Sequence, residues 1–138
     1  MITTKGRYAL RVMIDLAEHR GTGYIPLKDI AGRQGISKKY LEILVKDLVA
    51  RKLIAGASGR GGGYMLTREP GQYPIGEILE QMEGPLASVS CLAGDDNPCP
   101  RASTCPTLPL WEEYDRLIRD FFYGKKLSDL LETPPRSL

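Results

Sequence analysis

Histidine is nearly absent from this sequence, and its scarcity limits the chemistry that the protein can perform. His19 is the only histidine among 138 residues, and no His-Glu-x-x-His zinc motif occurs. A single histidine leaves general acid–base catalysis poorly supplied. We therefore expect a protein that is not an enzyme.

Long apolar runs are also missing. No stretch approaches the ~18 apolar residues that a membrane-spanning helix needs. The first residues, 1–7, are not followed by the unbroken apolar stretch of a secretory signal. The composition, 42% hydrophobic and 26% charged, is typical of a globular domain rather than of a disordered chain. We expect a cytoplasmic protein without a membrane partner.

Charge is distributed unevenly along the chain, although the formal net charge is only +2. Residues 1–66 carry 12 Lys/Arg and 5 Asp/Glu, whereas residues 67–138 carry 7 and 12. A basic half of this kind favours contact with a polyanion. A chance division of surface charge is the simpler alternative.

The basic half contains a helix-turn-helix pattern. Helical spacing of apolar residues predicts helices over 4–20, 27–34 and 38–52. Gly35 ends the second helix, and Ser37 is suited to cap the third. Two helices joined by a short glycine-containing turn are typical of DNA-binding motifs, although any helical hairpin can show the same pattern.

A short β-hairpin is expected directly after the third helix. Residues 53–57 and 64–66 can form strands, joined by a glycine-rich tip that bears Arg60. Glycines allow positive φ at such a tip and leave the backbone slim enough to approach a DNA groove. The expected fold class is mainly α with a small β-hairpin, that is, a winged helix-turn-helix.

The acidic half has fewer regular elements. Helices are expected over 74–83 and 108–123, followed by a short helix near 127–131 that Ser128 could cap. We divide the chain into four parts. They are a DNA-binding domain with its following helix (1–83), a cysteine-bearing loop (84–107), a dimerisation helix with a short last helix (108–132) and a tail (133–138).

All the cysteines lie in one polar loop. Cys91, Cys99 and Cys105 are spaced C-x7-C-x5-C. An odd number argues against a disulfide framework. Structural zinc sites usually contain a C-x2-4-C pair, which is missing here, whereas wider spacing suits an iron–sulfur cluster. Zinc and redox-active thiols remain open alternatives.

Several of these stretches together resemble a known family. They are residues 4–9, 35–37 with 40–42, 61–64 and 79–85, the three cysteines, and Leu110-Trp111. Over residues 1–132 the chain is similar to the IscR/NsrR/CymR group of bacterial winged-helix transcription regulators, and most like its IscR members, which are iron–sulfur cluster regulators.

The resemblance implies a homodimer that binds a palindromic operator in double-stranded DNA. It also implies an iron–sulfur cluster, of the two-iron two-sulfur type found in IscR, held by Cys91, Cys99 and Cys105, and control of cluster biogenesis genes. A zinc- or thiol-redox-sensing repressor of the same fold is the alternative. The amphipathic helix 108–123 would be the dimerisation helix, unless it packs within its own chain, and its expected dimer residues are Trp111, Tyr114, Leu117, Ile118 and Phe121.

The expected DNA contacts come from three segments. The helix 38–52 would enter the major groove, and Arg60 would enter the minor groove. Ser37 and Glu42 match DNA-contacting positions of the family, and the basic residues could instead be solvated surface charges. The full set of expected contacts is Lys5, Arg7, Ser37, Lys38, Lys39, Tyr40, Glu42 and Arg60.

The resemblance leaves the fourth cluster ligand open. Leu108 stands where IscR members carry a ligating histidine, and Arg7-Tyr8 stands where the nitric-oxide sensors of the group can supply an aspartate. The spacing of the first two cysteines is two residues longer than in the IscR pattern, and the wing arginine lies one place later. The remaining candidates are a small exogenous ligand or one of His19, Asp95, Asp96, Thr107, Glu112 and Glu113.

Overall fold

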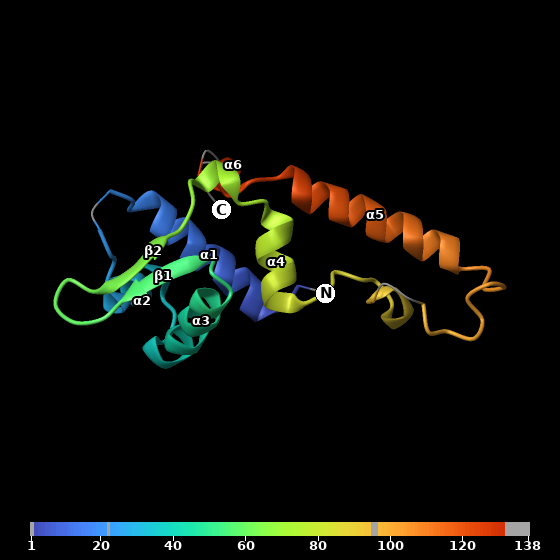
Figure 1. Cartoon of the computed structure of the whole chain (residues 1–138), viewed down its shortest axis with the longest axis horizontal. Helices are drawn as coiled ribbons and strands as arrows, with labels where there is room; N and C mark the ends of the chain where they lie inside the picture. The colour runs from blue at the N-terminus through green and yellow to red at the C-terminus, as the bar shows by residue number, and fades with distance from the viewer. Residues whose placement is uncertain (1, 22, 95–96, 132–138) are drawn as a thin grey trace.

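A computed structural model describes residues 2–21, 23–94 and 97–131. A helical body carries a two-stranded hairpin on one side, and one long helix projects from the other side (Figure 1). The elements, in chain order, are α1 (Thr4–Glu18), α2 (Leu27–Gln34), α3 (Lys38–Ala50), β1 (Ile54–Ala57), β2 (Gly63–Leu66), η1 (Pro70–Gln72), α4 (Ile75–Glu83), η2 (Ser90–Leu92), α5 (Leu108–Gly124) and α6 (Leu127–Leu131).

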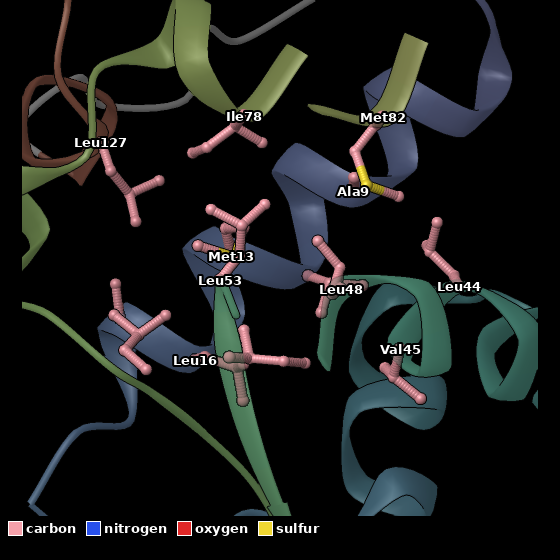
Figure 2. Close-up of a cluster of buried hydrophobic side chains, with 14 of the residues drawn as sticks. Ala9, Met13, Leu16, Leu44, Val45, Leu48, Leu53, Ile78, Met82 and Leu127 are labelled. Atoms are coloured by element: carbon pink, nitrogen blue, oxygen red, sulfur yellow. The ribbon is translucent and has the colours of Figure 1, made fainter. Parts of the chain in front are cut away.

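The core lies where α1, α3, β1, α4 and α6 meet (Figure 2). Met13 of α1, Leu48 of α3 and Ile78 of α4 are fully buried there, together with Leu53 and Leu127. Burying one such side chain stabilises the fold by about 1.5–3 kcal/mol. The body therefore has its own core, to which the projecting helix α5 contributes no fully buried residue.

The hairpin pairs as expected, and it gains a third segment that the sequence did not reveal. β1 and β2 are antiparallel, with Ile54 opposite Leu66. Ile25 bridges to Tyr64 through reciprocal backbone hydrogen bonds of 2.8 and 2.9 Å. Gly63 has φ +145°, and a Cβ there would lie 2.2 Å from the Ile25 carbonyl oxygen. The glycine at 63 is thus required by this close backbone approach.

Two predicted helix ends are wrong. α1 ends at Glu18 instead of residue 20, and α3 ends at Ala50 instead of Lys52. Lys52 takes a left-handed conformation, φ 62°, which cannot continue a right-handed helix. Val49, which its apolar character would place on the core face of α3, is 36% exposed because the core side of the helix ends with Leu48.

The cap expected for the last helix also differs. Ser128 lies inside α6, and the Asp129 carboxylate accepts a hydrogen bond from the Lys126 N–H at 2.9 Å instead. Thr3 is the N-cap residue of α1, but its side chain makes no capping bond. It donates to Glu83, which also accepts from the Gly6 N–H, so that α4 holds the start of α1. The predicted tail, 133–138, lies outside the described residues.

Asp15 is a buried charge that joins α1 to the helix-turn-helix. The Arg33 guanidinium donates to both carboxylate oxygens at 2.8 and 3.0 Å, and the Gln34 amide donates at 2.9 Å. Burial alone would raise the pKa of Asp15, but the hydrogen bonds from Arg33 and Gln34 and the nearby positive charge outweigh it and lower the pKa. The carboxylate therefore remains ionised although it is buried.

Replacing Asp15 with asparagine should lower the free energy of unfolding by about 2–3 kcal/mol. The substitution leaves the Arg33 charge without its partner, and the penalty is moderated because Arg33 is partly solvated. An unfolded Asp carboxyl titrates near pH ~3.9. Since the folded pKa is lower, the stabilisation is present above that value and is lost as the pH falls through the folded pKa. Urea titrations at several pH values should show wild type losing stability in acid more steeply than Asp15→Asn. Equal slopes would contradict this assignment.

Helix α5 is attached to the body at its C-terminal end. The Tyr123 ring packs against Gly76 of α4, where a Cβ would come within 2.3 Å of the ring. The Ile75 N–H donates to the Lys125 carbonyl at 2.8 Å, and an ion pair joins Arg119 to Glu80 at 2.5 Å. The N-terminal half of α5 extends away from the winged-helix body (Figure 1).

Candidate DNA interface and cysteine segment

Helix α3 has one buried and one outward face. Ser37 caps its start by accepting a hydrogen bond from the Tyr40 N–H at 3.2 Å, as predicted. The helix places Leu41, Leu44, Val45 and Leu48 in the core. The exposed residues at i, i+3, i+4 and i+7 spacing, named here the outer stripe, are Lys39, Glu42, Ile43 and Lys46.

The outer stripe borders a shallow groove between α3 and the hairpin. Glu42 and Lys46 line one side of this groove, and Gly56, Ser58 and Tyr64 line the other. Arg60 is exposed in the tip that joins β1 and β2. Helix and hairpin therefore form one continuous surface on the basic half of the chain.

The expected DNA-contacting cations differ in their surroundings. Within the described residues, Lys38, Lys39 and Arg60 are exposed and take part in no ion pair. The Lys5 ammonium lies 2.7 Å from the Asp47 carboxylate and lowers the pKa of Asp47. Lys5 therefore also joins α1 to α3, and its charge is partly offset.

Arg7 and Tyr40 lie beside this surface. Arg7 is exposed and donates to the Thr4 hydroxyl at 3.2 Å. The Tyr40 ring is half-buried and packs edge-on against Tyr8, with ring centroids 5.8 Å apart. Tyr40 thus supports the packing of α3 on α1, a contact that the sequence did not predict.

The cysteine segment, residues 84–107, links α4 to α5 and contains three free, half-buried thiols. Cys91 lies in the short helix η2. The Cys99 N–H donates to the Asn97 side chain at 2.9 Å, and the Cys105 Sγ lies 3.4 Å from the Thr107 Oγ1. Hydrogen bonds from Thr107 lower the pKa of the Cys105 thiol, which favours its thiolate form.

The structure does not gather the cysteines at one point. Among residues 2–21, 23–94 and 97–131, no group of three or more His, Cys, Asp or Glu side chains could hold a metal ion. The donor chemistry still suits a soft metal, because thiols on one segment are ligands for iron–sulfur clusters.

The candidate fourth ligands are dispersed. Thr107 is next to Cys105, whereas His19 lies at the far end of α1, where its Nδ1 is 2.8 Å from the Asp15 carbonyl oxygen. Asp95 and Asp96 lie outside the described residues. Glu112 and Glu113 are exposed on α5.

Helix α5 has one broad apolar stripe, as predicted, and the two edges of the stripe differ in exposure. Trp111 and Ile118 are half-buried and line a pocket of about 630 Å³ together with Tyr114, Ile2, Leu86 and Phe122. The more exposed edge, named here the α5 seam, consists of large side chains: Leu110, Tyr114, Leu117 and Phe121.

The five expected dimer residues all lie on this stripe, and the exposed Leu110 extends it. The α5 seam has the 4-3-4 spacing of a coiled-coil contact. Trp111 and Ile118 lie at the other edge of the stripe, along the pocket.

The cysteine segment is connected to α5 at two points. The Ser88 N–H donates to the Asp115 carboxylate at 2.9 Å. Cys105 comes two residues before Thr107, the N-cap of α5.

None of the helices in the described part of the chain has the length and apolar character that crossing a membrane requires.

Comparisons with known proteins agree with this architecture. The family model for Rrf2, the iron-dependent transcriptional regulator, matches residues 2–133. The transcriptional regulator IscR of Sodalis glossinidius is 35% identical over 130 residues, which cover 94% of this chain and 78% of the relative.

Solved structures of two regulators share the fold. CymR, the global cysteine regulator of B. subtilis, superposes with a TM-score of 0.78 at 34% identity, covering 98% of each chain. IscR of T. potens gives 0.76 at 35% identity, covering 96% of this chain and 86% of that one. The resemblance and the winged-helix prediction are confirmed: the chain belongs to the Rrf2 family of transcriptional regulators and has a DNA-binding winged-helix fold.

Proposed function

We propose that this chain is a homodimeric transcription regulator that binds a palindromic operator and senses an iron–sulfur cluster through Cys91, Cys99 and Cys105. The observation that carries the DNA-binding part is the outer stripe of α3 beside the exposed Arg60. The chain covers 78% of the IscR relative, so that most of that regulator has a counterpart here.

In this proposal α3 is the recognition helix and lies in the major groove. Lys38 and Lys39 at its start are exposed and can reach phosphates, and Arg60 enters the neighbouring minor groove. Ser37, at the N-terminus of α3, faces the DNA backbone. Glu42 can accept a hydrogen bond from a cytosine amine. Lys5 and Arg7 contribute weaker phosphate contacts, because Lys5 is already paired with Asp47.

The sensing part rests on the chemistry and place of the thiols. Three free cysteines in a segment without a core of its own have no packing role that would explain them. When bound, a cluster would supply a redox-sensitive group whose gain or loss changes the conformation of the segment. Cys91, Cys99 and Cys105 would be its protein ligands, with Thr107 or an exogenous ligand beside Cys105.

The position of the segment explains how sensing could reach DNA. The Ser88–Asp115 hydrogen bond and the Cys105–Thr107 contact connect the segment to the first half of α5. If α5 pairs two copies, its orientation sets the distance between the two recognition helices. Half-sites must lie about one helical turn apart, ~34–36 Å, for both helices to dock. Cluster occupancy would therefore change operator choice, and by the family resemblance the controlled genes are those of cluster biogenesis.

DNA binding by the dimer should be strongly salt-dependent. If about six phosphates are neutralised, the slope of log affinity against log salt concentration should be about −5. Lys39→Ala should make the slope shallower by about two, because it removes one phosphate contact from each protomer of the dimer. Fluorescence anisotropy with a labelled duplex measures both values.

Lys126→Ala is the matched control, since it removes the same charge from an exposed position in the acidic half. It should leave the slope unchanged. A wild-type slope near zero, or an equal change in both variants, would contradict the proposed interface.

A further inference from the structure

Ile43 is an apolar side chain in the middle of an otherwise charged surface. It is 63% exposed, whereas its neighbour Leu44 is 2% exposed. Single exposed apolar residues are common and need no explanation by themselves. The place of Ile43 is what distinguishes it, because Lys39 precedes it by one helical turn and Lys46 follows it by about one turn on the same outer stripe.

The outer stripe fits nucleic acid better than a protein partner. Lys39 and Lys46 provide positive charge at both ends of the stripe, and the wing adds Arg60. This charge complements the phosphates on the two sides of a major groove. Ile43, between the two lysines, would then face the floor of the groove, where the base edges are.

An isoleucine side chain cannot donate or accept a hydrogen bond. In the major groove the base edges offer donors and acceptors, and the thymine C5-methyl is the apolar group among them. Glu42, beside Ile43, can accept only from a donor such as the cytosine amine. The two adjacent side chains therefore have different and complementary preferences.

We infer that Ile43 is a specificity-determining residue that recognises a thymine methyl group in the operator. This inference rests on the proposed function, since it requires α3 in the major groove. It assigns one base preference to one side chain, and it can fail while DNA binding itself stands.

The test begins with a duplex obtained by selection from a random DNA library with the purified wild-type dimer. Each thymine of one half-site is then replaced singly by deoxyuridine, which lacks only the C5-methyl. At one position the replacement should lower wild-type affinity about fourfold, the value expected for one buried methyl group. Ile43→Ala should bind the unmodified duplex more weakly and show no further loss with deoxyuridine at that position.

Met65→Ala is the matched control, because Met65 is an exposed apolar residue on β2 and not on the outer stripe. It should keep the wild-type response to deoxyuridine. If every thymine gives the same response in wild type and Ile43→Ala, the inference about Ile43 is wrong although DNA binding stands. If the selection enriches no sequence, the proposed operator recognition fails, and the inference fails with it.

Discussion

Alanine at any one of Cys91, Cys99 and Cys105 should abolish the visible absorption of an iron–sulfur cluster in anaerobically reconstituted protein. Each substitution removes one of the three cysteine thiols in the sequence. A cluster held by two thiolates and weaker donors would not persist, because iron–sulfur clusters depend on thiolate ligation. The expected effect is a complete loss of the chromophore.

The same substitutions should leave the fold intact. The three thiols are half-buried in a segment outside the core, and the described core residues all come from the winged-helix body and α6. Circular dichroism and thermal unfolding of the apoprotein should therefore match wild type within about 0.5 kcal/mol, as for surface substitutions. A loss of folding would mean that the cysteines serve structure instead.

Ser103→Ala is the matched control within the segment. Ser103 is exposed, and the substitution changes a small side chain without removing a thiol. It should retain the cluster spectrum of wild type. Cysteine variants that keep that spectrum would contradict the ligand assignment.

The wild-type spectrum also distinguishes the rival sensors. Zinc bound to the thiols gives no visible band, and metal analysis would detect it. A thiol-redox sensor would show a disulfide by mass spectrometry after oxidation, with neither metal nor colour. Operator affinity measured with and without the cluster then tests the sensing step, and an affinity unchanged for every operator would contradict it.

The winged helix could be predicted from sequence because each of its elements has a local cause. Gly35 at φ 64° ends α2, Ser37 caps α3, and the glycine-rich tip turns the hairpin. The end of α3 has no such local cause, since Lys52 takes its left-handed conformation from the turn into β1 rather than from its own propensity. Local signals are sufficient where the residue itself fixes the backbone.

Long-range contacts had no local signal. The Ile25–Tyr64 bridge, the Asp15–Arg33 pair and the edge-on contact of Tyr8 with Tyr40 join residues far apart in the chain. The apolar stripe of α5 could be predicted from its helical spacing. The pocket that Ile2 and Leu86 line together with Trp111 could not, because its residues are far apart in the chain.

The α5 seam leads to the second large expected effect. Leu117→Asp should convert the protein into a monomer. Leu117 is 64% exposed in the single chain, and Leu110, Tyr114 and Phe121 continue the same stripe. Two such stripes can pair with coiled-coil spacing and remove each other's apolar surface from water. A carboxylate in the middle of that contact would be buried against its own symmetry copy without a partner, which is strongly unfavourable.

Sedimentation equilibrium at micromolar concentration measures the effect directly. Arg116→Asp introduces the same carboxylate next to Leu117 but off the seam, at another exposed position, and should remain a dimer. Affinity for a palindromic duplex should fall about 100-fold or more in Leu117→Asp, because the second half-site is then no longer bound at high effective concentration. Trp111→Asp combined with Ile118→Asp tests the pocket edge of the stripe: if this pair dissociates the dimer while Leu117→Asp does not, the pocket side of α5 is the interface and the seam is not.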